Sequence, residues 1–130
     1  MSDLFQTLSL SASGMRAQSM RLRHVSENIA NSDTPGYRRK LVAFEDTLKQ
    51  GVSTGEVSLG DVTLDQRELK RVFDPGHTLA DGSGYYDGSN VDLVVEIADA
   101  REAQRSYEAN LKIFDQARQM SSALFELLRR

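Results

Sequence analysis

Two long stretches of the sequence carry apolar or small residues at alternating steps of four and three, the spacing that gathers side chains on one side of an α-helix. The first stretch covers residues 4–31 and keeps this spacing through four heptads. A helix over these residues would reach about 42 Å, which is too long for the interior of a compact globule of this size. The large apolar members of its stripe are Leu4, Leu8, Met15, Leu22, Val25 and Ile29. The pattern therefore predicts a long helix whose stripe needs a partner.

The second stretch covers residues 91–128, contains neither glycine nor proline, and follows Ser89 and Asn90, which we expect to cap it. It predicts a helix of up to about 57 Å. Its stripe shifts by one residue on the way, as happens when a helix leaves a strict seven-residue repeat or changes partner. The large members of this stripe are Leu93, Ile97, Tyr107, Leu111, Phe114, Met120, Leu124 and Leu127. Both ends of the chain are thus expected to form amphipathic helices that pack in coiled-coil fashion.

The middle of the chain, residues 41–90, holds seven of the nine glycines and two short runs of alternating apolar residues, 57–59 and 62–64. So short and glycine-rich a segment cannot own a large core, and we expect a small hairpin that leans on the helices or an extended arm. The sequence therefore predicts a mainly α protein. Residues 1–40 and 91–130 together form its helical domain, and residues 41–90 form a small β-rich and loop segment.

The stripe of the first helix cannot stabilise that helix alone. Burying its side chains would contribute on the order of 10 to 15 kcal/mol. Fixing the backbone costs about 1 to 2 kcal/mol for each residue before hydrogen bonds offset it. The stripe must therefore meet another apolar stripe, which the second helix, another subunit or both could supply.

Composition excludes several kinds of chemistry. The chain has no cysteine, which removes disulfides, thiol catalysis and thiolate metal sites. Its net charge of −3 and the absence of a recognition motif argue against nucleic acid, although arginines gather near the first helix. The first twenty residues lack the regions of a cleaved signal peptide, and no apolar run is long enough to cross a membrane. We expect neither feature, and export by a signal-independent route if the protein works outside the cytoplasm.

The end of the first helix is marked by asparagine, hydroxyl and turn residues. Asparagine and aspartate side chains bond to nearby backbone groups, and proline followed by glycine suits the second and third positions of a type II turn. This pattern favours a helix stop. A second interpretation is a specific interface, in which two asparagines three residues apart and the following tyrosine hold the departing chain against neighbouring helices. The residues of this signature are Asn28, Asn31, Thr34, Pro35, Gly36 and Tyr37.

A second turn pattern contains one of the two histidines and consists of Asp74, Pro75, Gly76 and His77. His77 with neighbouring aspartates would make an acid–base group, but Asp-Pro-Gly is a turn signature and no nucleophile motif accompanies it. The run that begins at Asp81 starts like a calcium loop, yet lacks the glycine and the final glutamate that such a loop requires. We therefore expect no catalytic residue, no metal site and no cofactor.

The string from Asn28 to Tyr37 resembles the N-terminal signature of bacterial flagellar rod and hook proteins, which begin with such an amphipathic helix. Residues 72–85 and 90–96 resemble the middle, and the start of the C-terminal helix, of the C-type subunits of the proximal rod. The length fits as well, since distal rod and hook subunits carry much longer central domains. The resemblance covers nearly the whole chain and departs chiefly in residues 46–70.

The resemblance implies a structural subunit of the periplasmic rod of the flagellar basal body, and no enzyme. It also implies export by the flagellar type III apparatus without a cleaved signal, and assembly with other rod subunits and the base of the rod into a helical hetero-oligomer. In the family the terminal helices form the inner layer of the rod, so the two stripes would make contacts between subunits. The alternatives are another small rod subunit, a soluble coiled-coil adaptor or chaperone, and a metal-dependent enzyme that uses Asp74, His77 and Asp81.

Overall fold

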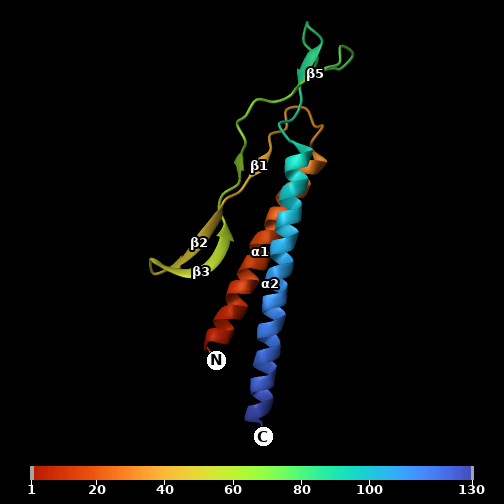
Figure 1. The fold of residues 1–130 in the computed structure, drawn as a ribbon. Helices are drawn as coiled ribbons and strands as arrows, with labels where there is room; N and C mark the ends of the chain where they lie inside the picture. The colour runs from red at the N-terminus through yellow and green to blue at the C-terminus, as the bar shows by residue number, and fades with distance from the viewer. Residues whose placement is uncertain (1, 130) are drawn as a thin grey trace.

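Two long helices form the frame of the molecule in the computed structural model, which describes residues 2–129. Helix α1 covers Ser2–Ala30 and helix α2 covers Leu93–Leu128, and together they hold half of the 130 residues. The helices lie side by side and run in opposite directions, so both ends of the chain are found at the same end of the molecule (Figure 1). The expectation of a helix at each end of the chain around a small β-rich middle is confirmed.

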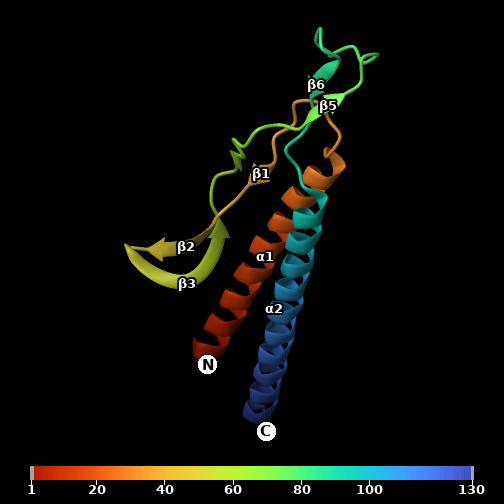
Figure 2. The same cartoon turned by 45° about the horizontal axis from the view of Figure 1, so that its top comes forward.

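The middle of the chain forms three separate two-stranded antiparallel sheets. These sheets are β1 (Lys40–Leu41) with β4 (Thr63–Leu64), β2 (Phe44–Lys49) with β3 (Val52–Leu59), and β5 (Arg71–Phe73) with β6 (Tyr85–Asp87). The β2–β3 hairpin lies beside α1, while the β5–β6 pair projects beyond the end of the helices where α1 ends and α2 begins (Figure 2). No sheet has a third strand to enlarge it, so the middle segment depends on the helices for its position.

The β2–β3 hairpin rests on α1 through its longer strand. Its two-residue turn has positive φ at Gln50 (54°) and Gly51 (78°), as a hairpin turn of type I′ requires. The pairing shifts register between Asp46 and Leu48, opposite the part of β3 that contains Gly55, whose φ is 77°. Hydrogen bonds join the hairpin to the helix: the backbone N–H of Val57 donates to Oγ of Ser13 at 3.2 Å, and the hydroxyl of Ser9 donates to Oε1 of Glu56. The hairpin therefore leans on α1, as the sequence predicts.

Helix α2 begins later and with a different cap than the sequence suggests. Its N-cap is Asp92, whose carboxylate accepts the backbone N–H of Val94 at 3.0 Å. The predicted cap at Ser89 and Asn90 is wrong, because both side chains are buried and already bound elsewhere. The Ser89 hydroxyl donates to the backbone oxygen of Ser32, and Asn90 bonds to residues of the middle segment. Only the aspartate carboxylate remains available for the first turn.

Most of the buried side chains of α1 and α2 are small or polar. The buried residues are Ser11, Ser13, Ala17, Val25 and Asn28 on α1, and Glu96, Ala103 and Ala117 on α2. Small residues let two helix backbones approach closely, and α2 presents Ala103 and Ala117 to α1. Of the predicted α1 stripe Val25 is buried and the other large members are half-buried. The large α2 members are mostly exposed. The second helix thus covers only part of either stripe.

Gly14 of α1 lies close to the side chain of Asn110 on α2. A Cβ placed on Gly14 would lie 2.8 Å from Nδ2 of Asn110, a separation that real Cβ atoms do not show. Asn110 has little freedom to move aside, since its Nδ2 donates to the backbone oxygen of Ser106 at 2.9 Å. The glycine therefore sets the distance between α1 and α2 at this point.

We expect Gly14→Val to lower the free energy of unfolding by about 1 to 3 kcal/mol, because the added side chain forces the helices apart. The measurement is urea unfolding followed by the helical circular dichroism signal. Ser19→Val is the control, since it places the same β-branched side chain on an exposed position of α1. Equal destabilisation by the two variants would contradict a close contact at Gly14.

Candidate assembly surfaces and their polar junction

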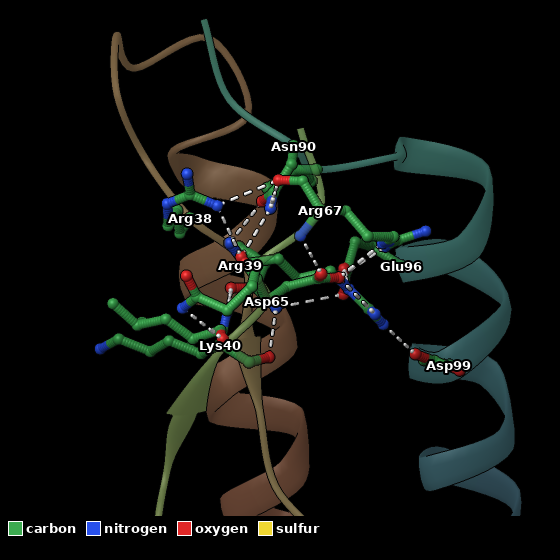
Figure 3. A network of polar contacts seen from close by, with 12 residues as sticks. Arg38, Arg39, Lys40, Asp65, Arg67, Asn90, Glu96 and Asp99 are labelled. Atoms are coloured by element: carbon green, nitrogen blue, oxygen red, sulfur yellow. Dashed lines mark hydrogen bonds and ion pairs between the residues drawn. The ribbon is translucent and has the colours of Figure 1, made fainter. Parts of the chain in front are cut away.

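A cluster of charged and amide side chains joins the start of α2 to the chain that leaves α1 (Figure 3). Glu96 lies at its centre and is completely buried. Arg39 donates from Nε to Oε1 of Glu96 and from Nη2 to Oδ2 of Asp99, the latter at 2.9 Å. A carboxylate out of contact with water is stable only when a cation and hydrogen bonds compensate its charge. We call this cluster the polar junction; it consists of Asn28, Arg39, Asp65, Asn90, Glu96 and Asp99.

Asn28 ties the departing chain to the last turns of α1. Its side chain is buried, and Oδ1 accepts the hydroxyl of Tyr37 at 2.8 Å and the backbone N–H of Lys40 at 2.9 Å. Its Nδ2 donates to the backbone oxygen of Lys40 at 3.1 Å and to Oε2 of Glu96 at 3.4 Å. Burial raises the pKa of the Tyr37 hydroxyl, which keeps it a donor. One amide thus holds two residues of the next segment and one of α2.

The rest of the signature forms the turn between these contacts. Helix α1 ends at Ala30, and the amide of Asn31 donates back to the oxygen of Glu27 at 2.8 Å. The N–H of Tyr37 donates to the oxygen of Thr34 at 3.2 Å, and Gly36 has a φ of 74°. These are the hydrogen bond and the third-position conformation of a type II turn. The signature therefore ends α1, and its side chains also hold the departing chain in place. The helices against which they hold it belong to the same chain.

Asp65 and Asn90 bring the middle segment into the polar junction. The Oδ1 of Asn90 accepts the backbone N–H of Arg39 at 2.7 Å, and its Nδ2 donates to the backbone oxygen of Asp65 at 2.9 Å. The buried carboxylate of Asp65 accepts both the N–H and the guanidinium of Arg67, at 3.0 and 2.8 Å. These bonds from Arg67 hold the pKa of Asp65 below its usual value. Segments far apart in the sequence therefore meet at one point.

Sequence reasoning placed Asn28 in the signature, took Asn90 for a cap, and did not assign the other members of the polar junction, which are Arg39, Asp65, Glu96 and Asp99. The one available signal is at Glu96, which is a carboxylate enclosed by Val95 and Ile97 in an apolar run. Asp65 and Asn90 stand in loops where polar residues are ordinary, so nothing in their surroundings indicates burial. They become buried only because folding brings the middle segment back to the helices at the polar junction.

The Asp74–His77 segment forms a turn, with the N–H of His77 donating to the oxygen of Asp74 at 3.0 Å. The imidazole stacks on the ring of Tyr86 with centroids 4.0 Å apart, and its Nδ1 accepts the N–H of Leu79 at 3.1 Å. Asp81 is equally occupied, because backbone N–H groups of the following residues and the guanidinium of Arg71 bind its carboxylate. Both groups serve to fold this loop. Within residues 2–129, no three His, Cys, Asp or Glu side chains lie close enough to hold a metal ion.

The outer surface of α2 is rich in large apolar side chains. Six of the eight predicted stripe residues are at least 37% exposed, and Tyr107 and Phe114 are half-buried. The six exposed residues are Leu93, Ile97, Leu111, Met120, Leu124 and Leu127. On α1 the predicted residues are better covered, by α2 and by the hairpin. The part of the chain that the structure describes contains no helix both long and apolar enough to cross a membrane.

The single chain also exposes more surface than a compact protein of its mass. It exposes 9060 Å² at 14.5 kDa. A compact monomer of this mass exposes about 6,900 Å², so the surplus is about 2,200 Å². A standard interface covers about 800 Å² of each partner, and the surplus is therefore enough for two or three contacts with neighbours. The helix pair is therefore elongated and only partly covered by the rest of the chain.

Comparison with known proteins agrees with this architecture. The family described as "Flagella basal body rod protein" matches residues 8–38, which span most of α1 and the signature after it. The family described as "Flagellar basal body rod FlgEFG protein C-terminal" matches residues 83–127, which span nearly all of α2. The chain belongs to the family of flagellar basal-body rod proteins.

Within that family the likeness is to proteins named flagellar basal-body rod protein FlgC. The relative from Agrobacterium fabrum is 39% identical, over 99% of this chain and 98% of the relative. The relative from Aquifex aeolicus is 36% identical over 97% of this chain and 98% of its own length, and one from Escherichia coli is 36% identical over 90% and 92%. The resemblance to C-type rod subunits that the sequence suggested is thereby confirmed, and the chain is a structural rod protein of the flagellar basal body.

Proposed function

We propose that this chain is a subunit of the proximal rod and that it builds the rod by packing its terminal helices, in coiled-coil fashion, against the helices of neighbouring rod subunits. The observation that carries this proposal is the position of the large apolar residues of α2, which lie outside the pair that α2 makes with α1. Exposed apolar surface on this scale is typical of a binding surface. The surplus of accessible surface supports the same conclusion.

The proposal also covers export of the chain and the place where it assembles. The chain reaches the periplasm through the flagellar type III export apparatus without a cleaved signal, and joins other rod subunits and the base of the rod in a helical hetero-oligomer. The polar junction supports folding that completes after export, because it needs Asn28 on α1 and Glu96 on α2 at the same place. An extended chain cannot satisfy the buried charge of Glu96 until both helices have arrived.

The proposed division of labour follows the fold. Residues 1–40 and 91–130 supply the helices of the rod core, and residues 41–90 lie outside them. The support for this division is that the β2–β3 hairpin lies against α1, while large apolar residues on the outer face of α2 are exposed. Asp65, however, belongs to the polar junction, so the middle segment also helps to hold the helix pair together.

The test of the proposal is Leu111→Asp in a flagellated host. A carboxylate at this exposed position should leave the subunit folded, because Leu111 does not lie between α1 and α2. Burying the same carboxylate against a neighbour should weaken association at least about a hundredfold, which removes the subunit from purified basal bodies and abolishes motility. Leu22→Asp should have the same effect through α1, and Lys112→Asp is the matched control that should assemble. Normal motility of both leucine variants would overturn the assembly role of the helices, and a stable helical dimer of the wild type in dilute solution would favour a cytoplasmic adaptor.

A further inference from the structure

The β2–β3 hairpin has one covered edge and one open edge. Strand β3 is the strand that packs against α1, and the backbone N–H of Val57 on its outer edge donates to Oγ of Ser13 at 3.2 Å (Figure 2). Strand β2 forms the opposite edge, and within residues 2–129 it pairs with β3 alone. An uncovered strand edge presents a row of unpaired backbone groups to which another strand can bind.

The register of the hairpin shows which residues of β2 turn their backbone groups outward. Val57 is paired with Asp46, and the N–H of Val57 leaves the hairpin to reach α1. In an antiparallel pair the two residues either bond to each other or both face outward, so the N–H and C=O of Asp46 face outward too. The alternation along a strand gives Leu48 the same direction. Thr47 faces inward, since its backbone oxygen accepts the hydroxyl of Thr54 at 2.8 Å.

The charges of β2 indicate which strand fits this edge. Glu45 and Lys49 are both exposed. Neither takes part in an ion pair within residues 2–129. They stand at equal distances on either side of Thr47, and their even separation puts them on one face of the strand. A strand with opposite charges placed in this way is complementary to a second copy of itself that runs in the opposite direction.

One register satisfies the backbone groups and the charges together. When two antiparallel β2 strands place Thr47 opposite Thr47, the outward groups of Asp46 meet those of Leu48, and Glu45 lies opposite Lys49. Each contact occurs twice, because the pair has a two-fold axis. A shift toward the start of β2 places Asp46 opposite Asp46, and a shift toward the turn leaves fewer residues paired. A parallel pair in register sets like charges side by side.

We infer that β2 of one copy of this chain binds β2 of a second copy, antiparallel and centred on Thr47, so that two hairpins form one four-stranded sheet. The strand order is β3–β2–β2–β3, and α1 of each copy lies at the outer edge, which stops the sheet at this size. Four strands are also more stable than the isolated pair of each hairpin. The contact closes at two copies, whereas a helical assembly needs contacts that continue, so the inference does not depend on the proposed function.

The test exchanges the two charges. Glu45→Lys sets a lysine opposite Lys49, and Lys49→Glu sets a glutamate opposite Glu45, so each variant alone brings like charges together twice. The interface is small, and we therefore expect sedimentation velocity to show pairs of the wild type only at high concentration. Each variant should raise the dissociation constant about tenfold or more. An equal mixture of the two variants, and the double variant Glu45→Lys with Lys49→Glu, restore opposite charges and should pair like the wild type.

A further variant tests the backbone contact. Asp46→Pro removes the N–H that faces outward and leaves the hydrogen bonds between β2 and β3, since proline is tolerated at the edge of a sheet. It should stay monomeric at the concentration at which the wild type pairs. The control is Glu68→Lys, which makes the same charge change as Glu45→Lys at an exposed position outside β2 and should pair like the wild type. Circular dichroism of each variant checks that the helices are retained.

Three results would overturn the inference. These are a wild type that stays monomeric at high concentration, a mixture of the two charge variants that pairs no better than either alone, and pairing that survives Asp46→Pro. Pairing through β2 is lost in dilute solution, which distinguishes it from the stable helical dimer of a cytoplasmic adaptor. The proposed function is judged separately, because Leu111→Asp changes α2 and leaves the edge of the hairpin intact.

Discussion

Glu96→Ala lowers the free energy of unfolding by about 3 to 5 kcal/mol, because it breaks a buried ion pair and leaves Arg39 with only the partly exposed Asp99 and the more distant Asp65 as carboxylate partners. The residue that loses its buried ion pair is Arg39, whose side chain is only 13% exposed and whose Nε donates to Glu96. Asn28 loses an acceptor in the same step. The measurement is urea unfolding followed by circular dichroism, with the change taken from the midpoint at constant slope.

Two further variants separate charge compensation from simple loss of volume. Asp99→Ala also removes a carboxylate bound to Arg39, but its side chain is 30% exposed and water can replace it. We therefore expect a cost of about 1 kcal/mol or less. The double variant Arg39→Met with Glu96→Leu replaces the pair by apolar side chains of similar size and should recover much of the lost stability. Equal effects of Glu96→Ala and Asp99→Ala would contradict a special role for the buried carboxylate.

The sequence predicted the parts of the fold that depend on local patterns. The steps of four and three placed both helices within two residues of their observed starts. This is possible because the apolar residues on one face of an α-helix recur in the sequence with the helical period. The glycines of the middle segment predicted a hairpin, and Gly51 and Gly55 take the positive φ values that a tight turn and a bulge need. Proline and glycine at positions 35 and 36 likewise predicted their turn.

What the sequence did not predict depends on which residues meet after folding. Ser89 and Asn90 are ordinary N-cap residues by type, yet they are used to bind other segments and Asp92 becomes the cap. The sequence left open whether the stripe of large residues on α2 would meet the first helix or another subunit. In the structure the small residues Ala103 and Ala117 are buried, and most of the large stripe residues are exposed. Periodicity identifies a face but does not say which of two faces the same chain will cover.

The burial of small residues and the exposure of large ones on α2 fit the proposed assembly. When small residues and a polar junction hold the helix pair together, few of its large apolar side chains are buried within one molecule. Those side chains stay exposed, as Leu111 and Leu127 do, and are the residues that the proposed assembly uses. The specificity of the pair comes instead from groups that tolerate only one arrangement, since a buried carboxylate without its cation is strongly unfavourable. The chain can therefore reach one defined fold and still present an incomplete surface.

Asn28→Ala is expected to lower the free energy of unfolding by about 2 to 4 kcal/mol, because it leaves two donors in a buried region without their acceptor. These donors are the hydroxyl of Tyr37 and the backbone N–H of Lys40, both bound to Oδ1 of Asn28. The control is Asn31→Ala, three residues later, where the lost bond closes the exposed end of α1. That variant should cost about 1 kcal/mol or less, since the carbonyl of Glu27 keeps its bond from the backbone N–H of Asn31. Urea unfolding of both proteins gives the comparison.

The decisive variant at this position is Asn28→Asp, which keeps the shape and the acceptor that Tyr37 and Lys40 use. It replaces the donor that faces Oε2 of Glu96 at 3.4 Å with a second oxygen, so two carboxylates meet in a buried place. At neutral pH we expect it to be at least as destabilising as Asn28→Ala, although it restores two hydrogen bonds. Repulsion from the neighbouring carboxylate raises the pKa of the introduced aspartate in the folded state, so this deficit should shrink as the pH falls and the aspartate takes up a proton. If Asn28→Asp were as stable as the wild type at neutral pH, Asn28 would serve only to accept bonds from the departing chain, and the contact between α1 and the start of α2 would not depend on its amide.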